Sequence, residues 1–388
     1  MDPSGCRLLY LDGYTVEGLR KDAPSSDAIG YGITASTAIR DGLRALGFDL
    51  RRAGPAGSPA GRSDREQRLS WILSTYQGVL RALVDDPPDA IFSFHAFSTF
   101  PGEIRRMALD LGQSVPIVGY THGSHWDPSD SFRFQAYPGM ELLDLANLHV
   151  LDRILLVSEY MRTTLRDNIG AFNSGLARQL DAKAVVVGLP LDVRRIDGCR
   201  SEQPAPRTTV VFNHAPVSSK NPDLFIRVMI RVLPRYEVDV LFTRNFGLRQ
   251  PGGPALAELA ERFPERVILG RDMPLDEYYR ALWAADLQVS TATHESLGVS
   301  TLEAMYTENC CILPRLGSYP EICNGHPDVL YELGEGTLEE RLCHFLDHPE
   351  QRRAVAAELK GMTAKYHPET VVAGIARTVL DVAPARLE

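Results

Sequence analysis

The stretch Ser290-Thr-Ala-Thr-His-Glu-Ser-Leu-Gly-Val-Ser-Thr-Leu-Glu303 decides the fold of this chain. It follows a short apolar run, crosses a polar loop and opens a helix at Gly298. The first backbone N–H groups of a helix attract anions, and glycine lets the main chain approach a bulky ligand closely. The pattern therefore predicts a strand, a loop and a helix whose start, at Gly298, Val299 and Ser300, seats a phosphate.

Two carboxylates flank this helix start. Glu295 precedes the helix and Glu303 lies in its second turn, so both can line one wall of a pocket. One carboxylate can accept hydrogen bonds from sugar hydroxyls and the other from a ribose diol. The structural alternative is that Glu295 caps the helix and Glu303 is solvated. The order strand, loop, glycine, helix favours the ligand interpretation.

Outward from this stretch, strand-like and helix-like patterns alternate along the whole chain. Strands are predicted at 7–11, 90–94, 116–120, 153–157, 184–187, 208–212, 239–243, 266–269, 287–290 and 310–314. Helices are predicted at 35–46, 69–83, 102–111, 140–148, 159–169, 222–232, 255–262, 275–284, 298–306, 338–346 and 351–360. Regular alternation of this kind indicates an α/β protein with parallel strands and crossover helices.

One polar segment interrupts the alternation. Residues 191–207 contain Pro204 and Pro206 and have no apolar period. We therefore expect a Rossmann-like domain at 1–190, a linker at 191–207 and a second Rossmann-like domain at 208–365. We also expect a C-terminal helix at 366–388, for which a crossing back to the first domain is one option. Ligands bind beyond the carboxyl ends of parallel strands, so two such sheets would face a shared central cleft.

Composition narrows the function classes. The chain has 388 residues and a net charge of −9, which argues against a broad surface for nucleic acid. A basic cluster at Arg51, Arg52, Arg62, Arg65 and Arg68 lacks interleaved aromatics, and we interpret it as a flexible surface rather than an RNA site. The sequence predicts no membrane span and no signal peptide, so the cytoplasm is the expected location. The six cysteines form no CxxC pair, and no metal site is expected.

The sequence also resembles a known family. Glu295, Gly298 and Glu303, followed by Cys310-Cys-Ile-Leu-Pro314 and Gly317-Ser-Tyr-Pro-Glu321, resemble the donor-site signature of retaining GT-B glycosyltransferases of the GT4 type. The resemblance implies the GT-B fold, a nucleotide-sugar donor, transfer of a hexose to an acceptor on the first domain, and neither metal nor cofactor. It also implies a front-side transfer in which neither glutamate is a nucleophile.

Further residues follow from the same resemblance. In Val211-Phe-Asn-His-Ala-Pro-Val-Ser-Ser-Lys-Asn-Pro222, Lys220 matches the lysine that binds the donor diphosphate. The Gly-Arg pair that precedes it in the family is replaced by Asn213-His214-Ala215, and Arg244 is the expected substitute cation. In the first domain, His122 follows a strand where the family often places a histidine beside the transferred sugar. Gly30 and Gly32 match a glycine loop near the phosphates or the acceptor.

Donor and acceptor stay open at this point. Within the family, the second half of the chain is most similar to the tRNA-queuosine mannosyltransferases, which implies GDP-mannose as donor, but the residues equally permit a UDP-hexose. The acceptor is a nucleoside-type or other small molecule, which the acidic composition favours, or a modified nucleoside in tRNA. Two further alternatives are a non-catalytic sensor of nucleotide-sugars and a GT-B-type epimerase. Oligomeric state is not predicted.

Overall fold

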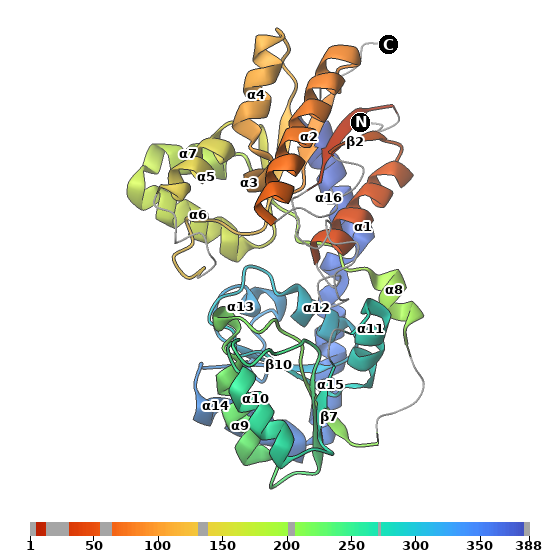
Figure 1. The fold of residues 1–388 in the computed structure, drawn as a ribbon, viewed down its shortest axis with the longest axis vertical. Helices are drawn as coiled ribbons and strands as arrows, with labels where there is room; N and C mark the ends of the chain where they lie inside the picture. Colours follow the sequence, from red (N-terminus) through yellow and green to blue (C-terminus); the bar gives the residue numbers. More distant parts are fainter. Residues whose placement is uncertain are drawn as a thin grey trace.

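The chain folds into two halves, each built on a six-stranded sheet (Figure 1). The computed structural model describes residues 5–12, 31–54, 64–130, 139–200, 206–270 and 273–383. We call the part with strands β1 to β6 the first half and the part with strands β7 to β12 the second half. Neighbouring strands run parallel in both sheets, as the alternating sequence pattern predicts.

The first sheet has the strand order β2-β1-β3-β4-β5-β6. Its strands are β1 (Arg7–Leu11), β2 (Asp49–Ala53), β3 (Ala90–Ser93), β4 (Ile117–Thr121), β5 (Arg153–Leu156) and β6 (Ala184–Val186). The helices of this half are α1 (Tyr31–Ala45), α2 (Asp64–Asp85), α3 (Ala96–Thr99), α4 (Pro101–Asp110), α5 (Met140–His149), α6 (Glu159–Phe172) and α7 (Ser174–Asp181).

The second sheet has the strand order β12-β11-β10-β7-β8-β9, which is the order of a Rossmann sheet. Its strands are β7 (Thr208–Phe212), β8 (Val238–Phe242), β9 (Val267–Leu269), β10 (Leu287–Val289), β11 (Cys310–Pro314) and β12 (Leu330–Tyr331). The α-helices of this half are α9 (Pro222–Val232), α10 (Gly253–Arg262), α11 (Leu275–Ala284), α12 (Val299–Tyr306), α13 (Tyr319–Ile322), α14 (Glu335–Asp347) and α15 (Pro349–Met362).

The central strands of each sheet lie within the hydrophobic core of their half. Every residue of β3 and β4 in the first sheet, and of β8 and β11 in the second, is buried. Parallel strands covered by helices on both faces need apolar side chains on both faces, which is why these segments are nearly continuous apolar runs. The sequence contains many such runs, and these central strands lie within a residue or so of the predicted positions.

The chain crosses between the halves twice. Helix α8 (Val193–Gly198) follows the first sheet and leads into the second. After α15, a 3-10 turn at Thr363–Tyr366 leads into α16 (Pro368–Leu380), which packs against α1 of the first half (Figure 1). The contact is close, because a Cβ atom at Gly42 of α1 would lie 2.8 Å from Cγ2 of Val372.

Several elements differ from the sequence prediction. The segment Leu191–Arg207, expected to be an irregular link, contains helix α8, whose Ile196 is fully buried. Arg51 and Arg52 are not part of a flexible surface: they lie on the edge strand β2, where Arg51 pairs with Asp86 at 2.8 Å. The sequence also missed the short elements α3, α7, α13 and β12. In the part of the chain that the structure describes, no helix meets the length and apolarity needed to cross a bilayer.

Candidate active site

The predicted donor residues lie where the strand order of the second sheet reverses. The segment after β7 and the segment after β10 leave neighbouring strands, because β10 pairs with β7. Thr293 N donates a hydrogen bond to Ser219 O at 2.8 Å, and Thr291 Oγ1 donates one to Lys220 O at 2.8 Å. The two loops are thus fastened together at the position where α/β sheets bind ligands.

An ion pair joins the two loops at this point. Lys220 Nζ lies 2.6 Å from Glu295 Oε2 and 3.4 Å from the carbonyl oxygen of His294. The side chains of Lys220 and Glu295 are 19% and 13% exposed, so the pair is largely desolvated but still reaches solvent. Burial acts to raise the pKa of Glu295, but the charge and hydrogen bond of Lys220 outweigh it and lower this pKa. Glu295 is therefore an anion beside a cation.

The helix start beside this pair is open. Gly298 has φ of 86°, a left-handed conformation that favours glycine, and α12 begins at the next residue, Val299. Within the described residues, no side chain caps this end of α12, so Glu295 does not have the capping role of the structural alternative. The first turn, with Val299 and Ser300, is partly exposed and carries the positive end of the helix dipole.

A buried polar network supports this helix start from below. Asn213 Nδ2 donates to Ser300 O at 2.7 Å, and Ser300 Oγ lies 3.2 Å from His214 Nδ1. Gln288 Nε2 donates to His214 Nε2 at 3.1 Å, so the proton of the ring is on Nδ1 and is donated to Ser300. Burial, aided by the charge of Lys220, lowers the pKa of His214 to about 3. The imidazole is therefore neutral and adds no positive charge to a phosphate site.

Glu303 is buried rather than solvated. Tyr278 OH donates to its Oε2 at 2.7 Å and Tyr279 OH donates to its Oε1 at 3.1 Å. Burial raises the pKa of Glu303 despite these two donors. The predicted substitute cation is close by: the guanidinium carbon of Arg244 lies 5.9 Å from the centre of the Tyr278 ring. Lys220 therefore lies beside Glu295, and Arg244 lies beside a tyrosine that binds Glu303.

The residues predicted in the first half lie in a separate group of contacts. His122 follows β4 and is buried against Phe94, Tyr120 and His95, at ring-centre distances of 4.6, 4.9 and 5.3 Å. Burial, together with the neighbouring His95, lowers the pKa of His122 well below its usual value, so this ring is neutral. Gly32 is the second residue of α1. Gly30 lies outside the described residues.

Sequence reasoning missed the supports of the site. Gln288, the centre of the Asn213–His214 network, is fully buried in β10 between two apolar neighbours. A polar residue inside an apolar strand is the signal that would have revealed it, because a buried amide needs partners. Tyr278 and Tyr279 had no comparable signal, since the helical pattern of α11 accounts for both. The nearby His125 pairs with Asp144 of α5 at 2.5 Å.

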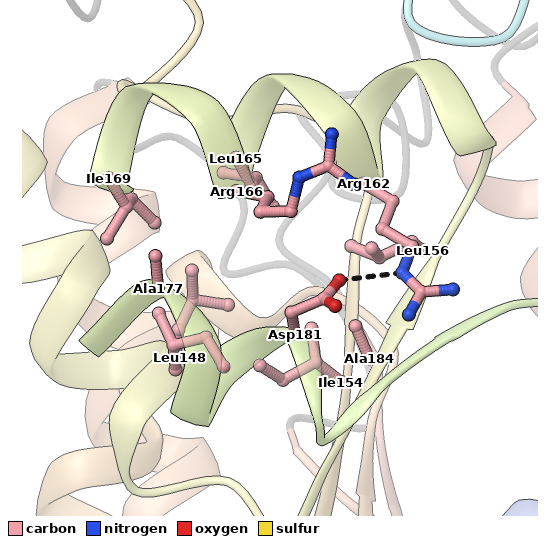
Figure 2. Close-up of a pocket in the computed structure, with 11 residues that line it drawn as sticks. Leu148, Ile154, Leu156, Arg162, Leu165, Arg166, Ile169, Ala177, Asp181 and Ala184 are labelled. Carbon is pink, nitrogen blue, oxygen red and sulfur yellow. Dashed lines mark hydrogen bonds and ion pairs between the residues drawn. The ribbon is translucent and has the colours of Figure 1, made fainter. Parts of the chain in front are cut away.

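Two other features of the described residues concern possible sites. A small apolar cavity lies among β5, α6 and α7, with an ion pair between Arg162 and Asp181 at 2.7 Å, and none of the predicted site residues lines it (Figure 2). In the described part of the chain, no group of three or more His, Cys, Asp and Glu side chains is arranged to hold a metal ion.

Comparison with solved structures identifies the class of fold. Sucrose-phosphate synthase from Thermosynechococcus elongatus has a TM-score of 0.72 at 14% identity, covering 96% of this chain and 98% of that one. The UDP-forming trehalose-phosphate synthase from Burkholderia xenovorans has a TM-score of 0.67 at 13% identity, covering 98% and 100%. Anabaena HepE in complex with UDP has 0.65 at 14% identity, covering 97% and 100%. The chain therefore has the GT-B fold of glycosyltransferases, as the resemblance implied.

Sequence comparison is more limited. No protein-family model matches the chain. A tRNA-queuosine alpha-mannosyltransferase from Drosophila melanogaster is 24% identical over 214 residues. The match spans 51% of this chain and 56% of that relative, so it concerns about half of each protein.

Proposed function

We propose that this chain is a retaining glycosyltransferase that moves a hexose from a nucleotide-sugar to a nucleoside-type or other small-molecule acceptor. The observation that carries the proposal is the Lys220–Glu295 ion pair of 2.6 Å beside the open start of α12. The GT-B fold supports it. Two structural neighbours also support it, because HepE was solved in complex with UDP and the trehalose-phosphate synthase is UDP-forming.

In this proposal the cationic groups stabilise the leaving nucleoside diphosphate. Negative charge develops on the leaving phosphate during transfer, and preorganised positive groups in a partly dry site stabilise it strongly. Lys220 supplies a full charge, held in place by Glu295 and the carbonyl of His294. The N–H groups of Gly298, Val299 and Ser300 supply the dipole of α12. Arg244 supplies a second positive charge for the diphosphate, because His214 is neutral.

The remaining residues orient the sugar and the ribose. Glu295 accepts hydrogen bonds from sugar hydroxyls with lone pairs that Lys220 leaves available. Glu303 accepts from a ribose diol, since each of its oxygens holds one tyrosine hydroxyl and has a second lone pair. His122, neutral and on the first half, contributes hydrogen bonding beside the anomeric carbon. Transfer takes place on the front face of the sugar, with the donor phosphate assisting removal of the acceptor proton.

The donor is a UDP-hexose or GDP-mannose. The UDP in the structural neighbour supports the former, and the mannosyltransferase similarity supports the latter. That same similarity favours a second candidate function, mannosylation of queuosine in tRNA. The net charge of −9 favours a small acceptor, because tRNA binding needs clustered basic residues.

The first test is a thermal-shift panel of UDP-, GDP- and TDP-sugars, followed by transfer assays with the donor that binds. A donor at 100 times its Kd stabilises the protein by about 2.7 kcal/mol. We expect Lys220→Ala and Glu295→Ala to abolish transfer and to lose most of the donor-dependent shift while the variants stay folded. Lys360→Ala, which removes a lysine paired with Glu308, is the matched control.

Each alternative has its own outcome. Near-normal turnover in both variants would refute the site assignment. Binding without release of free nucleotide would identify a sensor, and conversion of the sugar without acceptor would identify an epimerase. Mannose transfer to queuosine-containing tRNA, but not to free nucleosides, would establish the second candidate function.

A further inference from the structure

The start of α6 in the first half contacts α13 of the second half (Figure 1). Glu159 N and Tyr160 N donate to the two carboxylate oxygens of Glu321, at 3.1 and 3.0 Å. The next N–H group, that of Met161, donates to Ser158 Oγ at 3.1 Å. The first turn of α6 is therefore capped jointly by its own serine and by a carboxylate from the other half.

Ser158 and Ser318, which precede α6 and α13, each bind the loop that carries Glu295. Ser158 Oγ also donates to the carbonyl oxygen of Ser296 at 2.6 Å, across the two halves. Ser318, at the start of α13, donates its N–H to the carbonyl oxygen of Glu295 at 3.1 Å. Two consecutive carbonyls of this loop are thus bound, one by the N-cap residue of α6 and one by the N-cap residue of α13.

A third contact between the halves involves His294, the residue before Glu295. His294 Nδ1 is 2.9 Å from Ser129 Oγ of the first half. The imidazole nitrogens also lie 3.6 Å from one carboxylate oxygen each of Asp127 and Asp130. Asp127 in turn accepts from Tyr160 OH at 3.0 Å, which returns to the first turn of α6. Residues 294, 295 and 296 are consequently each held by a contact within this group.

We propose that Glu321 and Ser158 are positioning residues for the Lys220–Glu295 pair: Ser158 binds the Glu295 loop from the other half, and Glu321 binds the helix start that follows Ser158. The expected role of these residues in donor binding rests on the proposed function. These contacts couple the position of the Glu295 loop to the contact between the halves. If the halves separate, Glu321 loses the two N–H groups of α6, and the Glu295 loop keeps only its hydrogen bonds within the second half.

The effect of breaking these contacts is moderate and measurable. A carboxylate at a helix start contributes about two- to five-fold in an equilibrium constant. Glu321→Ala removes that contribution and both acceptors, whereas Glu321→Gln keeps one acceptor oxygen and loses the charge. Glu332→Ala, which removes a more exposed glutamate paired with Arg315, is the matched control. Ser158→Ala removes the second contact without touching α13.

The test combines structural and kinetic readouts on the full chain. We expect Glu321→Ala to speed amide hydrogen exchange at residues 159 and 160 and at residues 294 to 296, and to increase the radius of gyration in X-ray scattering. We expect its KM for the donor to rise by about two- to five-fold, with Glu321→Gln intermediate and Glu332→Ala unchanged. A purely structural role would lower the melting temperature without this graded change in KM.

The outcomes separate the two proposals. Unchanged exchange at residues 294 to 296 and unchanged KM in both Glu321→Ala and Ser158→Ala would overturn the positioning role. Exchange and scattering need no substrate, so faster exchange in a chain that transfers no sugar would retain the coupling of the halves and refute the proposed activity. If Glu321→Ala does not fold, Glu321→Gln and Ser158→Ala decide the question by the same readouts.

Discussion

At the scale of single residues, the candidate site combines charged side chains with neutral, buried side chains that hydrogen-bond to one another and to α12. His214 occupies a place in the chain where the resembling family carries a cation, yet its ring is buried and bonded to Gln288 and Ser300. A charged imidazole there would be desolvated and would lie near Lys220. His214 therefore acts as a rigid spacer between β7 and α12, and the positive charge of the site comes from lysine and arginine.

The buried His214 makes stability depend on pH. Its pKa is about 3 in the folded chain and near 6.5 when unfolded, so below pH 6.5 the unfolded chain binds a proton that the folded chain does not. This contribution to stability is complete above pH 6.5 and is lost as the pH falls toward 3, at about 1.4 kcal/mol per pH unit. We expect the free energy of unfolding of His214→Gln to fall less steeply between pH 6.5 and 4.5 than that of the unaltered chain.

Urea unfolding at several pH values measures this difference. The other titrating groups, including buried His122, are shared by both chains and cancel in the comparison. Parallel curves for the two chains would contradict the assignment of a neutral, proton-excluding His214.

Single residues also show what the sequence could and could not predict. The sequence predicts Lys220, Glu295 and Gly298 together, and the structure brings them together, because each lies in a segment that follows a recognisable strand. The two tyrosines on Glu303 were not predicted, because a hydroxyl on a buried helix face looks like any other core aromatic. Glu321 was noticed as part of a motif, but its contact with α6 depends on how the two halves meet.

At the scale of elements, α13 is short, and the residue before it lies directly against the loop that carries Glu295. Gly317, just before it, has φ of 56°, and a Cβ atom there would lie 2.6 Å from the carbonyl oxygen of Glu295. Glycine is required on both counts, since the left-handed conformation disfavours side chains and the backbone of Glu295 leaves no space.

We expect Gly317→Ala to lower the free energy of unfolding by about 1–3 kcal/mol and to weaken donor binding, because the Glu295 backbone must shift. Gly361→Ala is the matched control: it has ordinary backbone conformation, and nothing lies within 4 Å of the added methyl group. Urea denaturation and the donor-dependent thermal shift measure the two effects. Equal behaviour of the two variants would show that the close approach of α13 does not matter.

The elements that sequence reasoning missed have physical reasons. Strand β2 reads Asp-Leu-Arg-Arg-Ala and pairs with β1 alone, so it lacks the apolar run of a central strand. Helix α13 has four residues, one of them proline, which is too short for a periodic pattern. The central strands and long helices were predictable because their buried residues recur as apolar runs or with helical period in the sequence. Short connecting elements are too short to show such a pattern.

At the scale of the whole molecule, α16 joins the end of the chain to its beginning. Its buried face includes Val372, Ile375 and Val379, and the helix packs against α1. The domain boundaries inferred from the sequence stay a prediction, but the return of the last helix to the first half is a property of this fold.

We expect Val372→Asp to destabilise the protein by about 3 kcal/mol or more, because it places an unpaired charge against Gly42 of α1. Ala373→Asp puts the same charge on the exposed face of the same helix and should leave the melting temperature nearly unchanged. Thermal unfolding followed by circular dichroism compares them. Equal melting temperatures would mean that α16 contributes little to the first half.

The double crossing also limits how this protein can be recombined. The first half is not one continuous stretch of chain: strands β1 to β6 precede the second half, whereas α16, which packs against α1, follows it. A chimaera that exchanges the first half with that of another GT-B protein therefore needs two junctions, one near α8 and one before α16. With a single junction, the apolar faces of α1 and α16 would come from different parents and would not match.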